Sequence, residues 1–80
     1  MEQEGEFQEK AARLELTAAQ EIHKRTFGRI QDLRVELING QLVVRGSTNS
    51  YYVKSLALEA AQEVRALVCP IPLLVDIHVN

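Results

Sequence analysis

Two histidines and one cysteine, His23, His78 and Cys69, are the side chains whose chemistry most often serves catalysis or metal binding near neutral pH. A zinc site needs three or four ligands, whereas His78 has only Asp76 beside it on one face of a predicted strand. A thiol in an apolar stretch, such as that around Cys69, is more typical of a small buried hydrophobe than of a nucleophile. No glycine-rich phosphate loop is present. We therefore predict no catalytic residue, no metal site and no cofactor, and hence no enzyme.

A pair of arginines is the first candidate for a binding surface. The hairpin register derived below places Arg34 directly opposite Arg45, and like charges in opposed positions destabilise a sheet. Either Glu36 and Asp76 neutralise this pair, or the two arginines bind an anion. Apolar side chains are expected on the same face, which suits it equally to protein contact. The candidate interaction surface consists of Arg34, Val43, Arg45, Leu74 and His78.

A stripe on the helix predicted near residues 51–67 is the second candidate. At about 100° per residue, four side chains fall roughly 100° to 160° from Val53, away from the apolar side of that helix. Apolar anchors flanked by bases are typical of helices that lie on anionic phospholipid membranes. In the alternative interpretation, Tyr51 packs on the helix N-terminus and Leu58 is half covered by the first helix. The stripe comprises Tyr51, Lys54, Leu58 and Arg65.

The net charge of the chain limits the classes of partner that it is expected to bind. The 80 residues carry a formal net charge of −2, which argues against nucleic acid, because phosphate binding needs clustered Lys and Arg. From His23 to Lys54, however, six bases stand against two acids, so this middle segment carries +4 and suits an anionic membrane surface. The sequence has neither an apolar signal segment nor a membrane-spanning run. We expect a cytoplasmic protein, either free or peripheral to the inner membrane.

A β-hairpin is the clearest element that positions the arginines. Apolar residues alternate with polar ones in residues 32–37, and a second apolar alternation follows in 41–45. Between them, Asn39 and Gly40 both tolerate the positive φ that a type I′ turn requires. In such a hairpin Leu37 faces Leu42, so the apolar residues of both strands lie on one face.

Two helices and a last strand complete the pattern. Apolar residues recur at helical spacing in about 51–67, two prolines then end the helix, and alternation resumes in about 73–79. The side of this helix predicted to face the core consists of Val53, Leu56, Ala57, Ala60, Ala61, Val64 and Leu67. Near the N-terminus, Thr17 and Gln20 form a capping box before a helix from Ala18 to Phe27, with Gly28 as its C′ residue. One longer helix from about Gln8 is the alternative. We interpret residues 1–16 as an acidic tail or frayed helix extension and residues 17–80 as the domain.

This order predicts an α+β fold, α-β-β-α-β, with a three-stranded sheet and two helices packed on one face. Residues 28–80 resemble a BON domain, the small module named after bacterial osmotic-stress and nodulation proteins. The resemblance lies in the hairpin VELINGQLVVRG from Val35 to Gly46 and in the alanine-rich helix KSLALEAAQEV from Lys54 to Val64. The family's usual Gly-Val before the last strand is replaced by LVCPIP from Leu67 to Pro72, so that turn is built differently.

The resemblance implies a non-enzymatic module, of a kind often attributed to phospholipid or membrane-surface binding. The uncovered sheet face favours protein association instead, either with a second copy of the chain or with a docked protein partner. Binding to an anionic phospholipid surface through the basic middle segment and the second helix is the alternative.

Overall fold

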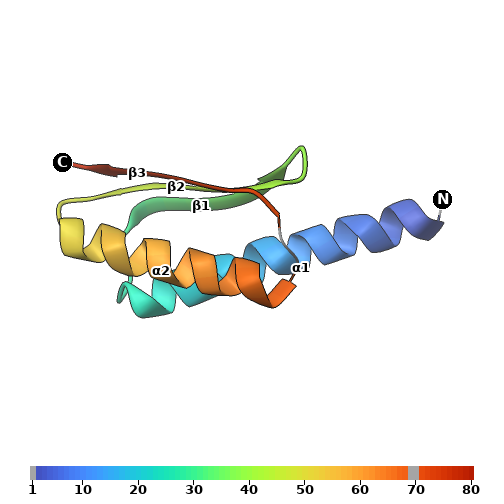
Figure 1. The fold of residues 1–80 in the computed structure, drawn as a ribbon, viewed down its shortest axis with the longest axis horizontal. Helices are drawn as coiled ribbons and strands as arrows, with labels where there is room; N and C mark the ends of the chain where they lie inside the picture. Colours follow the sequence, from blue (N-terminus) through green and yellow to red (C-terminus); the bar gives the residue numbers. More distant parts are fainter. Residues whose placement is uncertain (1, 69–70) are drawn as a thin grey trace.

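The computed structural model describes residues 2–68 and 71–80, which form two helices and three strands (Figure 1). The element order confirms the predicted α-β-β-α-β fold. The elements are α1 (Glu2–Arg25), β1 (Gln31–Ile38), β2 (Gln41–Thr48), α2 (Tyr51–Val68) and β3 (Leu73–Val79). Both helices lie on one face of the sheet, and the N-terminal part of α1 extends beyond the sheet (Figure 1). None of the described elements covers the opposite face of the sheet.

The strand order is β1-β2-β3, so β2 is the central strand. It pairs antiparallel with β1 through the hairpin and parallel with β3 through the crossover helix α2. A parallel connection needs such a long crossover, because the chain must return to the start of the sheet before the next strand begins. The crossover places α2 against β2 and β3, while α1 packs against α2 and β1.

The hairpin has the predicted turn and register. Asn39 and Gly40 have φ values of 52° and 76°, as the type I′ turn requires. Leu37 pairs with Leu42, and Arg34 pairs with Arg45. Because side chains alternate between the two faces, this register sends the leucines toward the helices and the arginines to the uncovered face.

Gly40→Val is expected to lower the free energy of unfolding by about 1 kcal/mol or more, because a β-branched residue resists positive φ. No heavy atom lies within 4 Å of the position that a Cβ would occupy at Gly40, so the loss reports backbone strain rather than a clash. Chemical denaturation of the two proteins measures the difference. An unchanged midpoint would contradict the left-handed conformation of this residue.

A bulge interrupts the start of the hairpin. Gln31 pairs with Ser47 and Arg34 with Arg45, so two residues of β1, Asp32 and Leu33, lie opposite Gly46 alone. Asp32 adopts a φ of 53°, a conformation that Asp tolerates better than most residues. The sequence pattern did not predict this irregularity.

The core lies between the sheet and the helix layer. Its larger cluster joins α1, β2, α2 and β3, and a smaller cluster surrounds the fully buried Leu42. Small residues on α2 allow the helix to approach the sheet closely. The larger cluster consists of Ile22, Ile30, Val44, Val53, Ala57, Ala60, Ala61 and Ile77.

The first helix differs from its prediction. It runs without a break through Thr17, which is exposed in mid-helix and is not an N-cap. The longer-helix alternative is therefore correct, because good helix formers flank Thr17 on both sides. At the other end, Phe27 and not Gly28 takes the first left-handed position, with φ of 56°, and the Gly28 N–H donates to the His23 carbonyl at 2.9 Å.

Candidate functional site

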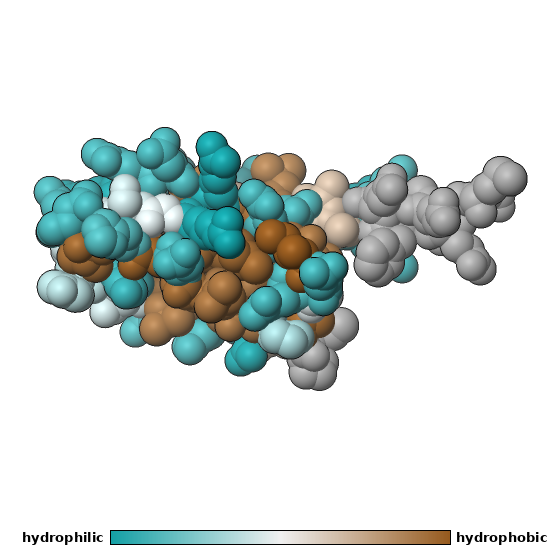
Figure 2. Space-filling view, turned by 90° about the horizontal axis from the view of Figure 1, so that it is seen from above, coloured by the Kyte–Doolittle hydropathy of each residue, from teal (hydrophilic) through white to brown (hydrophobic). Residues whose placement is uncertain are grey.

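The uncovered side of the sheet, called the outer face here, brings most of the predicted interaction surface together. Arg34, Arg45 and Asp76 lie in one row across the three strands, because Arg45 pairs with both of the others. His78 pairs with Ser47 in the next row. Figure 2 looks down on this face and shows hydrophobic surface in the middle of the molecule, bordered by hydrophilic surface. The side chains of Arg34, Arg45, Asp76 and His78 are all exposed. Ser47, which lies beside His78, is half-buried.

Val43 is the exception within the predicted surface. It occupies the outer face of β2, but only 4% of it is exposed, so it cannot serve as a contact residue of its own. The physical reason is its place on the central strand, where Glu36 of β1 and Leu74 of β3 flank it in register. Leu74 is 44% exposed and is the apolar residue of the surface that a partner can reach.

The electrostatics of the outer face rest on the two opposed arginines. Within the described residues, neither Arg34 nor Arg45 lies within ion-pair distance of Glu36 or Asp76. Two bases and two acids nevertheless share this face, because Asp76 lies in the row of the arginines and Glu36 lies in the row beside it. Charges of both signs on one exposed face can be matched by a protein surface of mixed charge.

The two edges of the sheet differ in protection. On β1, the N–H of Leu37 donates to the carboxylate Oε2 of Glu15 at 2.8 Å. A side chain of α1 therefore satisfies a backbone N–H at this edge of the sheet. The bulge at Asp32 also distorts this edge, and both devices discourage pairing with another strand. On β3, no comparable contact is made among the described residues. Sequence reasoning missed Glu15, because no local pattern connects residues 15 and 37.

The predicted lipid-binding stripe lies on the flank of α2 that faces away from α1. Glu63 marks the side toward α1, since it forms an ion pair with Arg25. At about 100° per residue, the four residues of the stripe lie roughly 120–180° from Glu63 around the helix. Tyr51 is 76% exposed and Leu58 38% exposed, whereas Lys54 and Arg65 are half-buried. The structure therefore brings Tyr51, Lys54, Leu58 and Arg65 onto one flank of α2.

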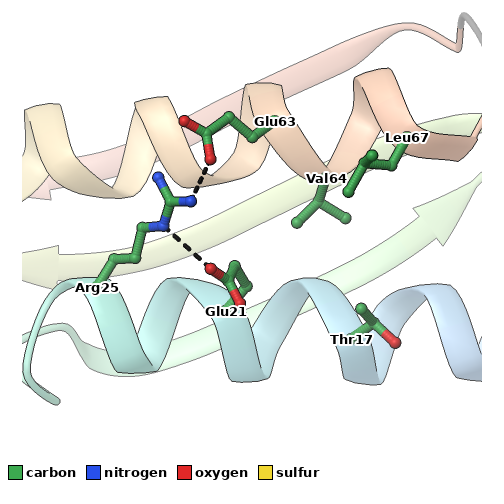
Figure 3. Close-up of a pocket in the computed structure, with 6 residues that line it drawn as sticks. All are labelled: Thr17, Glu21, Arg25, Glu63, Val64 and Leu67. Atoms are coloured by element: carbon green, nitrogen blue, oxygen red, sulfur yellow. Dashed lines mark hydrogen bonds and ion pairs between the residues drawn. The ribbon is translucent and has the colours of Figure 1, made fainter.

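A groove between α1 and α2 was not predicted (Figure 3). Arg25 crosses it: its Nε donates to Glu21 Oε1 at 3.0 Å, and its guanidinium pairs with Glu63 of α2. Hydrogen bonds to Glu63 and then to Glu21 raise the pKa of Arg25. The groove encloses about 140 Å³, less than the roughly 300–1,000 Å³ of typical small-molecule sites. Both carboxylates are engaged by the arginine, so the groove offers no free acid–base pair.

Leu67 belongs to this groove, although its helical phase predicted a core position. It is 86% exposed, because it lies in the last turn of α2 opposite the short side chain of Thr17. Leu56, also predicted in the core, is half-buried. These two corrections leave the buried side of α2 narrower than the sequence pattern indicated.

No metal site stands out in the described part of the chain. It contains no group of three or more His, Cys, Asp or Glu side chains placed to hold a metal ion. His23 lines only a shallow surface hollow beside Ala19 and Leu33, and Cys69 lies outside the described residues. Neither helix, as far as it is described, is both long and apolar enough to cross a bilayer.

Comparison of the chain with protein-family models, curated proteins and solved structures found no match in any of the three. The resemblance to BON domains stays a prediction, and function has to be argued from the surface itself.

Proposed function

We propose that this domain is a non-catalytic protein-association module that pairs with a second copy of itself through the uncovered part of the sheet. The observation that carries the proposal is the one-sided helix layer, which leaves the outer face and the edge of β3 open (Figure 1). Soluble proteins usually cover or block such surfaces, because unpaired strand edges recruit further strands. The resemblance of residues 28–80 to BON domains also favours a binding module over an enzyme.

A second copy suits this surface because the surface is complementary to itself. The outer face carries two arginines, Arg34 and Arg45, and two carboxylates, Glu36 and Asp76, so an identical face or edge can place opposite charges together. Two-fold pairing of one surface with itself is also the commonest way in which soluble chains assemble.

Sedimentation velocity over micromolar to millimolar concentrations tests the proposal. We expect a reversible monomer–dimer equilibrium in the micromolar range, because an edge of this length gives a small interface. Leu74→Asp should shift the equilibrium toward monomer by adding an unpaired charge beside the edge. Glu59→Asp, on the exposed side of α2, is the matched control and should leave the equilibrium unchanged.

A protein that stays monomeric at every concentration would overturn the proposal. Co-sedimentation with vesicles of phosphatidylcholine and phosphatidylglycerol then separates the alternatives. Binding of a monomer to these vesicles, reversed by moderate salt and by the double change of Lys54 and Arg65 to Gln, would assign the α2 flank to an anionic lipid surface.

A further inference from the structure

The open edge of β3 presents its backbone groups in a fixed pattern. The Leu42 N–H donates to the Pro72 carbonyl, and the Asn80 N–H donates to the Thr48 carbonyl, both at 2.9 Å. In a parallel ladder, alternate residues of a strand bond to the same neighbour. The even-numbered residues of β3 therefore bond to β2, and the N–H and C=O groups of Leu73, Val75, Ile77 and Val79 point to the open edge.

These outward groups restrict how another strand can pair. The side chains of the same four residues face the helix layer. If an antiparallel second copy of β3 is to keep its apolar side chains on that same face, its odd-numbered residues must lie opposite the odd-numbered residues of the first copy. For a second copy of β3, the three registers that meet this condition with the longest overlap of the two strands are centred on Val75, on Asp76 and on Ile77. They differ in what the outer-face residue Asp76 meets.

Charge distinguishes the three registers. Centring on Asp76 places this carboxylate opposite its own copy, and like charges directly opposed are destabilising. Centring on Val75 places Asp76 opposite Leu74 of the second copy. Centring on Ile77 places Asp76 opposite His78 of the second copy, twice across the two-fold axis. These are non-hydrogen-bonded pairs, in which opposed side chains lie closest.

We infer that two copies of the domain join through antiparallel β3 edges about a two-fold axis at Ile77, with Asp76 of each copy opposite His78 of the other. The result is one continuous six-stranded sheet with all four helices on one face. This pairing rests on the self-association proposed above and specifies its surface and register.

The flank of α2 enlarges the interface beneath the joined strands. Leu58, on the side of α2 away from α1, is 38% exposed, and a second α2 on the other side of the axis would cover it. Lys54 and Arg65 on the same flank are half-buried, so their stems can pack while their charged ends stay in water. Apolar burial here adds to the hydrogen bonds of the strand pair.

A charge-swap series at pH 7 tests the register by sedimentation equilibrium. Asp76→Lys removes the carboxylate to which a ring N–H of His78 can donate, and His78→Glu places two carboxylates opposite each other. Each change is expected to raise the dimer dissociation constant about tenfold, since it acts twice per dimer. The double variant places opposite charges at the two facing positions and is expected to dimerise at least as well as the wild type.

Glu59→Lys is the matched control, because it makes a charge reversal on the exposed side of α2, away from the β3 edge and the outer face, and should leave dimerisation unchanged. Circular dichroism of each variant at low concentration verifies that the monomer is folded. A wild-type dimer whose single variants are unaffected, or whose double variant is not restored, would overturn this register while leaving self-association standing. A wild type that is always monomeric would overturn both.

Discussion

Leu42→Ala is expected to lower the free energy of unfolding by about 2–5 kcal/mol. Leu42 is fully buried on the central strand, where Ala18 of α1 and Val64 of α2 surround it in the smaller core cluster. Truncation removes apolar burial and leaves a cavity that three secondary-structure elements would have to move together to close. For a chain of this size the whole stability is roughly 4–12 kcal/mol, so the variant should be close to unfolding at room temperature.

The matched control is Leu74→Ala, the same truncation on the neighbouring strand. Leu74 lies on the outer face and is 44% exposed, so its loss is expected to cost less than about 1 kcal/mol. Urea denaturation at a concentration that keeps the protein monomeric compares the two variants. Similar costs at the two positions would contradict the assignment of an inner and an outer sheet face.

The hairpin was predictable because its information is local. Asn39 and Gly40 specify the turn, and the turn together with the period-two alternation fixes the pairing of Leu37 with Leu42 and of Arg34 with Arg45. The helix α2 and the strand β3 were also evident from their periodicity. The α-β-β-α-β order follows from these elements and is what the structure contains.

The burial of Val43 was not predictable by the same reasoning. Alternation places Val43 on the outer face, but its exposure depends on whether β2 has a neighbour on both sides, and local patterns do not specify strand order. Pairing of β3 with β2 makes β2 central and covers Val43. The contact of Glu15 with β1 was not predictable for the same reason, because the hydrogen bond joins residues that are 22 positions apart in the sequence.

The spacing of apolar residues in α2 identifies most of the buried side of this helix, but it does not show where that side ends. Leu67 follows the helical spacing of Val53, Ala60 and Val64, yet it is exposed because the packing partner across the groove, Thr17, is short. Periodicity describes the direction in which a side chain points. Whether the side chain is covered depends on the length and position of α1. The residues of α2 carry no information about either.

The bulge at Asp32 leads to the second large effect on stability. Opposite the bulge, a Cβ on Gly46 would lie 2.5 Å from Cγ2 of the core residue Ile30 and 3.2 Å from the carbonyl oxygen of Gln31. The bulge brings the backbone before β1 over Gly46, and only a residue without a side chain leaves room for Ile30. Gly46→Ala is therefore expected to cost about 1–3 kcal/mol through overpacking.

A double-mutant cycle with Ile30→Ala separates this clash from other causes. Ile30 is buried, so its truncation alone should cost about 2–5 kcal/mol, but it also removes the methyl group that a Cβ at position 46 would strike. The double variant should then be less destabilised than the two single costs added together, by about 1 kcal/mol or more. Complete relief is not expected, because the contact with the Gln31 carbonyl remains. The same cycle with Gly40→Ala in place of Gly46→Ala should be additive, since open space surrounds Gly40, and additivity in both cycles would contradict the close approach of Ile30 to Gly46.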